Sequence, residues 1–302
     1  MTDLPTALLS DLPTALPSAL PRDPQLHALL ALAQRAGALA REHLGLVERL
    51  EKRGAEAVTE ADRAVQRLIV NELNATHPQD GIIGEENDDG SAITNRAPTV
   101  GQRVWVIDPI DGTNNYVAGF GAFAVCIGLL DHGLPVLGVV YDVMREEAYL
   151  GQPGVGAWLI RRTPTKEVVW RPVQALTTPP GPQTLLMLTS NLLVNNHLPR
   201  WALRLLTVCP WKLRMLGSAA LECVQVGAGT AHGAITLNGK LWDVAAAAAV
   251  VLAAGGRVTD FKGQAVFPFD LTGYSGAKVP FLATTASALP AFVAELAHTD
   301  PA

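Results

Sequence analysis

Residues 104–113 read VWVIDPIDGT, an apolar run that leads directly into two acidic side chains. The four apolar residues at 104–107 predict a short buried strand, and Asp108 is then expected at its carboxyl end, where the chain must turn. Gly112 allows the backbone to approach a ligand closely. Two carboxylates, Asp108 and Asp111, with no His or Cys nearby suit Mg²⁺, Mn²⁺ or Ca²⁺ better than zinc. An acidic surface turn would show the same residues, so this stretch alone leaves both interpretations open.

Three further acidic clusters lie along the chain. Glu85 follows a small apolar strand at residues 81–83. Asp62 lies at the start of a predicted amphipathic helix, whose apolar residues recur at helical spacing. Asp243 begins an alanine-rich helix that is predicted to end at Gly255-Gly256. Acidic residues commonly cap helix N-termini, so capping is the simpler explanation of Asp62 and Asp243 when each is taken singly.

Taken together and in this order, the four clusters resemble those of the inositol monophosphatase family, within the superfamily that includes fructose-1,6-bisphosphatases and bisphosphate nucleotidases. The first family signature is similar to residues 105–116, WVIDPIDGTNNY, and the second to residues 241–246, LWDVAA, followed by Ala254-Gly255-Gly256. The resemblance covers roughly residues 25 to 290. It implies a mixed fold, α+β or α/β, whose halves stack into a five-layered α-β-α-β-α sandwich.

The resemblance also implies a set of metal ligands. Glu85, Asp108 and the backbone carbonyl of Ile110 would hold a first Mg²⁺. Asp108 would bridge to a second Mg²⁺ that Asp111 and Asp243 also bind, and a third, weaker ion would lie beside Glu85. Mn²⁺ is an expected substitute. Hard cations accept backbone oxygen as a ligand, so a role for the Ile110 carbonyl is chemically reasonable.

Three residues are expected to take part in catalysis by the same resemblance: Thr113, Asp62 and Glu85. Thr113 and Asp62 would form a pair that orients the attacking water and helps to deprotonate it. Because a threonine hydroxyl is not a strong base by itself, Asp62 must accept its hydrogen for this relay to work.

Substrate contacts are expected from a second group of residues. The backbone N–H groups of Gly112 and Thr113 could meet phosphate oxygens if a helix begins there, beside Asp111. Gly217 and Ser218 match the substrate-binding turn of the family, although Ser218 could equally be a helix N-cap.

Two positions bear on substrate identity. Inositol-type members carry a Glu seven residues before the last metal Asp, and Thr236 stands there in this chain. The loss of a charged hydrogen-bond acceptor argues against a preference for polyols. Lys240 could meet a second phosphate or a carboxylate, or it could be a solvated loop charge.

The function implied is that of a Mg²⁺-dependent phosphomonoesterase acting on a small phosphorylated metabolite, with sensitivity to lithium. Inositol-1-phosphate is the first candidate substrate. Histidinol phosphate, a 3′(2′),5′-bisphosphate nucleotide, fructose-1,6-bisphosphate and NADP are alternatives. A non-catalytic, metal-binding regulatory protein is the alternative of another class, against which the complete acidic set argues.

Composition is consistent with this function without deciding it. The 302 residues carry a net charge of −5, and no Lys/Arg block suggests a nucleic-acid partner. Three cysteines without CxxC spacing are expected to be reduced and buried. No apolar run is long enough to span a membrane. The predictions are a cytoplasmic protein with no nucleic-acid or membrane partner and, by resemblance, a homodimer as one expected assembly.

The chain is expected to fall into three parts. Residues 1–22 repeat Leu-Pro-Thr-Ala-Leu and are predicted to be a disordered or loosely packed extension rather than a signal peptide. Residues 23–183 would form an N-terminal α+β domain with most metal ligands, including an antiparallel meander over 123–150. After a Pro-rich hinge at 172–182, residues 184–302 would form a C-terminal α/β domain that supplies Asp243 and the substrate loops.

Overall fold

The computed structural model describes residues 23–45, 50–51, 57–58, 60–86, 93–96, 102–194 and 196–298. The predicted extension at residues 1–22 lies outside the described residues. Two short strands, β1 (Leu50–Glu51) and β2 (Ala57–Val58), pair antiparallel with one another.

An eight-stranded sheet forms the centre of the first part of the chain. Its order is β10-β9-β8-β7-β6-β5-β3-β4, and every neighbouring pair is antiparallel except β3 and β5. The predicted antiparallel meander is confirmed, and it extends beyond the predicted residues by two further strands. The strands are β3 (Gly81–Gly84), β4 (Ile93–Arg96), β5 (Val104–Asp111), β6 (Ala124–Asp131), β7 (Leu134–Asp142), β8 (Glu147–Gln152), β9 (Gly156–Arg162) and β10 (Val168–Val173).

Strand β5 differs from the prediction in a way that matters for the site. It does not end at Asp108 but continues to Asp111, with a register shift between these two residues. Asp108 pairs with Cys126 and Asp111 with Ala124, so β5 carries one more residue than β6 over this interval. Side chains alternate between the two faces of a regular strand, so residues three apart point to opposite faces. The extra residue of the bulge lets both carboxylates reach the same site.

Two helices cover one face of this sheet, α1 (Pro24–His43) and α2 (Glu60–Thr76). Helix α2 was predicted from its helical spacing. Asp23 caps α1 by accepting a hydrogen bond from the backbone N–H of Gln25 at 2.9 Å. The buried faces of the two helices share a core with strand residues such as Ile107 and Val139.

The other face is covered by α5 (Ala219–Gly227) and α6 (Leu241–Ala253), which come from the second part of the chain. Residues 245–249 of α6 are all alanine, so the helix backbone can approach the sheet closely. Gly128 of β6 lies so close that a Cβ built on it would be 2.8 Å from the amide nitrogen of Ala246. Small residues on both surfaces therefore allow this contact.

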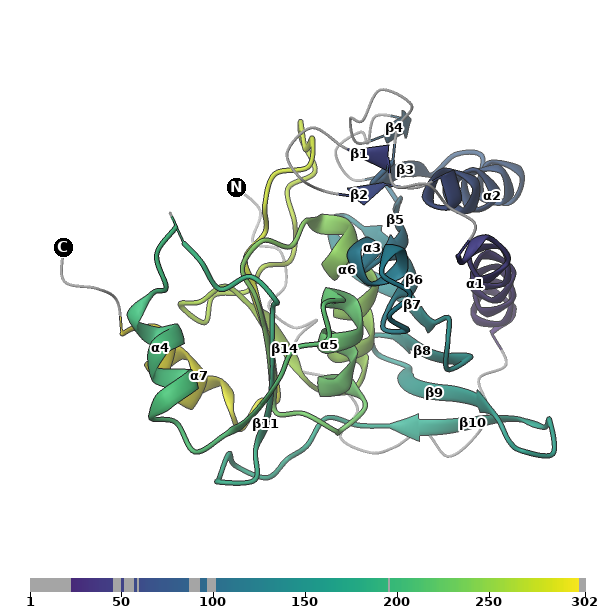
Figure 1. Ribbon diagram of the computed structural model, residues 1–302. Coiled ribbons are helices and arrows are strands. Elements are labelled where there is room, and N and C mark those ends of the chain that lie inside the picture. Colours follow the sequence, from purple (N-terminus) through teal and green to yellow (C-terminus); the bar gives the residue numbers. More distant parts are fainter. Residues whose placement is uncertain are drawn as a thin grey trace, which may run out of the picture.

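A second, five-stranded sheet packs on the far side of α5 and α6, in the order β12-β11-β13-β15-β14. Its outer face is covered by α4 (Arg200–Thr207) and α7 (Leu289–Leu296), where Trp201 and Phe292 are buried against the sheet. The layers are α1 and α2, sheet, α5 and α6, sheet, α4 and α7 (Figure 1). The predicted α-β-α-β-α sandwich is confirmed. The strands are β11 (Leu185–Leu188), β12 (Lys212–Arg214), β13 (Gly233–Thr236), β14 (Arg257–Thr259) and β15 (Phe281–Thr284).

The Pro-rich stretch at 172–182 connects the two sheets. Its first residue, Pro172, belongs to β10 and pairs with Trp158. A proline is tolerated there because β10 is the edge strand of its sheet. The division into domains at residues 183 and 184 stays a prediction. No helix among the described residues is both long and apolar enough to cross a bilayer.

Candidate active site

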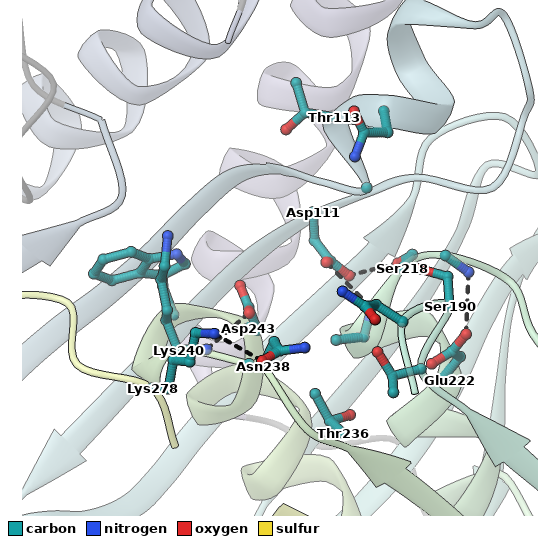
Figure 2. Close-up of a pocket in the computed structure, with 18 of the residues that line it drawn as sticks. Asp111, Thr113, Ser190, Ser218, Glu222, Thr236, Asn238, Lys240, Asp243 and Lys278 are labelled. Atoms are coloured by element: carbon teal, nitrogen blue, oxygen red, sulfur yellow. Dashed lines mark hydrogen bonds between the residues drawn. The ribbon is translucent and has the colours of Figure 1, made fainter. Parts of the chain in front are cut away.

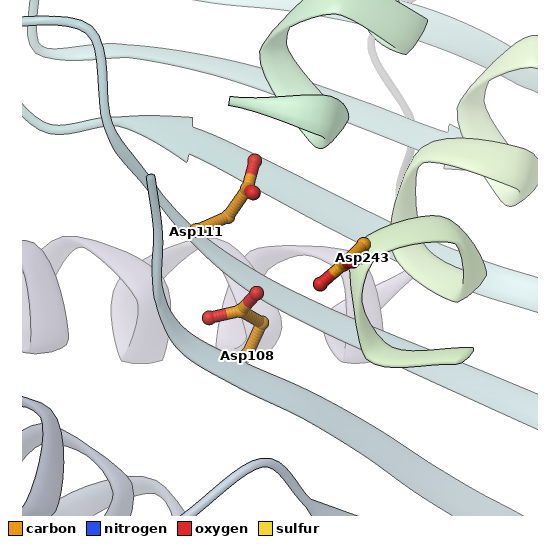
Figure 3. Close-up of side chains that lie close together, drawn as sticks. All are labelled: Asp108, Asp111 and Asp243. Atoms are coloured by element: carbon orange, nitrogen blue, oxygen red, sulfur yellow. The ribbon is translucent and has the colours of Figure 1, made fainter. Parts of the chain in front are cut away.

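Three carboxylates converge where β5 meets the start of α6. Asp108, Asp111 and Asp243 each offer one oxygen, and these oxygens all lie within 4.8 Å of one another (Figure 3). The bulge in β5 places the first two, and Asp243 comes from the first turn of α6. Asp243 also accepts a hydrogen bond from the backbone N–H of Lys240 at 2.8 Å, so it caps the helix as well. The capping and clustering interpretations of Asp243 therefore both apply.

Burial and mutual repulsion raise the pKa of each of these carboxyl groups. Desolvation is the main cause for Asp108, whose pKa is well above its ordinary value, followed by repulsion from Glu85. Desolvation likewise raises the pKa of Asp243 and that of Asp111, the latter to about 6. A divalent cation would remove this repulsion, and an all-carboxylate oxygen set is typical of hard cations. The residues present therefore fit a site for Mg²⁺ or a similar ion.

Glu85 lies beside this cluster rather than within it. The parallel pairing of β3 and β5 brings their carboxyl ends to the same edge, where the backbone N–H of Glu85 donates to the carbonyl of Ile107 at 3.2 Å. Glu85 is half-buried and lines the cavity described below. Its proximity to the cluster is evident in the raised pKa of Asp108.

Thr113 and Asp62 come together although 51 positions separate them. The hydroxyl of Thr113 lies 3.4 Å from Oδ1 of Asp62 and 3.1 Å from the carbonyl oxygen of Ile110. Asp62 is fully buried in α2, and Thr113 is the first residue of the short helix α3 (Thr113–Val117). The structure thus brings together the two members of the predicted catalytic pair and the carbonyl predicted as a metal ligand.

The backbone at Gly112, next to Asp111, packs closely against the turn at residues 216–218. Gly112 has a φ of 95°, and a Cβ there would lie 3.2 Å from the carbonyl oxygen of Gly217. Ser218 donates its hydroxyl to Asp111 and accepts from the backbone N–H of Leu221, as an N-cap of α5 does. Two backbone N–H groups at the start of α5 also donate to Asp111, at 3.2 and 2.8 Å. The Ser218 hydroxyl and these two backbone groups therefore hold Asp111 in place.

Glu222 anchors the same turn, and the sequence analysis did not identify it. Its Oε1 accepts hydrogen bonds from the backbone N–H groups of Leu216 (2.7 Å) and Gly217 (3.0 Å). Asn115 fixes the turn from the other side, because its amide donates to the carbonyl of Leu216 at 2.7 Å. Burial raises the pKa of Glu222 to about 8. One signal was available in the sequence: Glu222 is the single charged residue of α5.

A cavity of about 650 Å³ opens over these residues. Figure 2 shows Asp111 and Asp243 between two sides, with Ser218, Ser190 and Glu222 on one and Lys240, Lys278 and Asn238 on the other. The parallel strands β11 and β13 end at the cavity, a position where open α/β sheets commonly bind ligands. The residues that line it are Glu85, Asp111, Gly112, Thr113, Asn114, Thr189, Ser190, Asn191, Leu193, Asn196, Gly217, Ser218, Ala219, Glu222, Thr236, Asn238, Gly239, Lys240, Trp242, Asp243 and Lys278.

Thr236 lies at the end of β13 and is 2% exposed. Its hydroxyl has no hydrogen-bond partner within the described part of the chain. A buried hydroxyl without a partner is costly, so a ligand in the cavity could supply what the protein does not.

Comparisons with known proteins agree with these features. The profile described as the inositol monophosphatase family matches residues 22–297. Inositol monophosphatase 1 of Sus scrofa is 32% identical over 249 residues, which cover 80% of this chain and 84% of that protein. Fructose-1,6-bisphosphatase/inositol-1-monophosphatase of Thermotoga maritima is 32% identical over 238 residues, covering 78% and 84%. Nus factor SuhB of Xylella fastidiosa is 31% identical over 247 residues, covering 80% and 83%.

Solved structures give the same result. An IMPase from Thermotoga maritima has a TM-score of 0.75 to this structure at 29% sequence identity, and the match covers 91% of this chain and 97% of that one. Sequence profile, sequence relatives and fold all point in one direction: the chain belongs to the inositol monophosphatase family of phosphatases.

Proposed function

We propose that this protein is a Mg²⁺-dependent phosphomonoesterase that hydrolyses a small phosphorylated metabolite. The observation that carries the proposal is the cluster of Asp108, Asp111 and Asp243 at the edge of a polar cavity. A purely structural role does not account for three carboxylates, two buried and one half-buried, placed so close together, because their repulsion destabilises the fold unless a cation neutralises it.

These carboxylates, with Glu85 and the carbonyl of Ile110, would hold Mg²⁺ ions. Such ions, when bound, neutralise charge on the transferred phosphate and lower the pKa of water so that a nucleophile forms near neutral pH. Mn²⁺ has the same ligand preferences and is expected to substitute.

The protein's own groups would position the attacking water. The hydroxyl of Thr113 would accept a proton from water as it passes its own hydrogen toward Asp62, 3.4 Å away. Burial of Asp62 in α2 keeps this carboxylate away from bulk solvent, so its position in the relay is fixed.

Phosphate oxygens would be bound by the backbone N–H groups of Gly112 and Thr113, which line the cavity beside the carboxylates. Ser218 was expected to bind substrate, together with Gly217. Because its hydrogen is donated to Asp111, we propose that Ser218 orients that ligand instead.

The proposal is tested by measuring phosphate release from a panel of monoesters with Mg²⁺ and with a chelator. Inositol-1-phosphate is the first candidate, and the panel includes histidinol phosphate, a 3′(2′),5′-bisphosphate nucleotide, fructose-1,6-bisphosphate and NADP. Asp108→Asn should lower turnover by at least about a hundredfold, the order expected when one preorganised electrostatic group is lost. Asp131→Asn, at a half-exposed carboxylate at the end of β6, is the matched control and should retain activity. Mg²⁺-independent release would contradict the proposal.

A metal-binding regulatory role is the second candidate, and the similarity to Nus factor SuhB of Xylella fastidiosa is the observation that favours it. Absence of phosphate release from every substrate in the panel, with Mg²⁺ bound, would support this role. The cytoplasmic location, the absence of a nucleic-acid partner, the homodimer and the lithium sensitivity stay predictions.

A further inference from the structure

Two lysines form one side of the cavity, on segments that are far apart in the sequence. Lys240 precedes α6, and Lys278 precedes β15. Figure 2 shows both on the side of Asp243 that faces away from Ser218 and Glu222. The cavity therefore carries two positive side chains next to the carboxylate cluster.

This side is held in place by backbone contacts. The N–H of Val279 donates to the carbonyl of Gly239 at 2.6 Å, which joins the segment of Lys278 to that of Lys240. The hydroxyl of Tyr274 accepts from the N–H of Leu241 (2.8 Å) and donates to the carbonyl of Ala277 (2.9 Å). Both lysines thus extend from tethered segments that line the cavity.

The ammonium group of Lys278 is oriented by a neutral partner. Lys278 donates to the side-chain carbonyl of Asn238 at 2.8 Å, and none of the ion pairs between described residues includes it. An ammonium has three donors, so Lys278 has two more for a ligand. Lys240 lies over the ring of Trp242, with its ammonium 5.3 Å from the ring centroid.

Thr236 supplies an independent observation. It lines the same cavity, and its buried hydroxyl lacks a protein partner among the described residues. With an uncharged residue here, the cavity floor does not oppose the binding of an anion as a carboxylate would. A neutral polyol would gain little from two ammonium groups, whereas an anionic group gains charge-assisted hydrogen bonds.

We infer that Lys240, Lys278 and Asn238 form a subsite for a second anionic group of the substrate, a phosphate or a carboxylate. The preferred substrate is then a phosphomonoester with two anionic groups, one at the carboxylate cluster and one at the lysines. This inference rests on the proposed phosphomonoesterase function, because it assigns the first anionic group to that reaction.

Two pairs of substrates test the subsite, each differing in one group. Fructose-1,6-bisphosphate and fructose-6-phosphate differ in a second phosphate. 3-Phosphoglycerate and glycerol-1-phosphate differ in a carboxylate. The wild-type protein should show a kcat/KM about tenfold higher for the doubly anionic member of one pair, through KM, since each hydrogen bond to a charged group contributes that order of affinity. The pair that discriminates identifies the second group.

Lys278→Gln should lower the ratio of the two kcat/KM values within that pair. The double variant Lys240→Gln/Lys278→Gln should lower it further, toward one. Lys262→Gln, an exposed lysine outside the cavity, is the control and should keep it. Equal kcat/KM values within both pairs, or equal losses for both members of a pair, would overturn the subsite. Equal losses would mean that Lys278 only supports the Asn238 loop.

Failure of the proposed function gives a different result, namely no phosphate release from any of the four compounds. Calorimetric titration then decides the subsite, with fructose-1,6-bisphosphate and fructose-6-phosphate as probes in the presence of Ca²⁺. The subsite is supported if the wild type binds the bisphosphate more tightly than fructose-6-phosphate and Lys278→Gln weakens binding of the bisphosphate. Equal affinities of the wild type for the two compounds would overturn it.

Discussion

At the scale of single residues, Glu222 couples the stability of the fold to pH. Its carboxyl group is 1% exposed, and burial raises its pKa from 4.5 to about 8. Between these two values the unfolded chain releases the proton while the folded chain keeps it. The folded state therefore binds more protons, and its stability falls as pH rises through this range.

Glu222→Gln should remove this part of the pH dependence. A glutamine Oε1 can accept the same two backbone hydrogen bonds, but it does not ionise. Urea unfolding in EDTA at pH 5.5 and pH 8 should show that the wild type loses more free energy of unfolding than the variant, by on the order of 2 kcal/mol. Parallel losses in the two proteins would show that Glu222 does not contribute.

Thr236→Glu should shift substrate preference. A carboxylate at this position would accept hydrogen bonds from polyol hydroxyls and repel a second anion. The ratio of kcat/KM for inositol-1-phosphate to that for fructose-1,6-bisphosphate should rise, by about tenfold. Thr236→Gln, which places an uncharged side chain at the same position, is the control. An unchanged ratio in Thr236→Glu would show that other loops set the preference.

The sequence predicted the acidic residues of the site better than the residues that hold the surrounding loops in place. Asp108, Asp111 and Asp243 lie in motifs that can be recognised locally, and the structure brings them together. Glu222 and Lys278 could not be identified in this way. Their partners, the turn at 216–217 and Asn238, are set by tertiary packing and not by neighbouring sequence.

At the scale of elements, the regular spacing of apolar residues allowed helices and strands to be predicted, whereas an irregular strand pairing could not be predicted. Helix α2 and the meander from β6 to β8 formed where they were predicted, because their apolar residues repeat with the period of the structure. The bulge in β5 could not be predicted, because an extra residue is defined only by its pairing with β6.

Contact between the first sheet and α6 gives a prediction at this scale. A Cβ on Gly138 of β7 would collide with the carbonyl oxygen of Ala246, and backbone atoms cannot move without displacing the helix. Gly138→Ala should lower the free energy of unfolding by about 2 kcal/mol, as overpacking does. Chemical denaturation would measure this. Gly181→Ala, with no neighbouring atom within 4 Å of the added Cβ, is the control, and equal stability of the two variants would contradict the packing argument.

At the scale of the whole molecule, metal binding should stabilise the fold. Asp108 and Asp111 come from the first sheet, whereas Asp243 comes from a helix of the second part. An ion bound by all three would link these parts and relieve their repulsion. Mg²⁺ at about 100 times its Kd should add about 2.7 kcal/mol to the free energy of unfolding, seen as a higher Tm than in EDTA.

Asp108→Asn gives the matching control for this measurement. The variant should have a higher Tm than the wild type in EDTA, because one buried charge is removed, and a smaller gain with Mg²⁺. An equal Mg²⁺-dependent rise in both proteins would place the ion elsewhere.

The central helices also constrain the order in which the protein can mature during synthesis. The eight-stranded sheet is finished at Val173, but the helices that cover its inner face end only at Gly227 and Ala253. A nascent chain that has left the ribosome up to β10 therefore presents a wide apolar surface to its surroundings, since the two helices that cover this face come later in the chain. Chaperone contact is expected to be strongest in that interval and to end when the alanine-rich helix emerges.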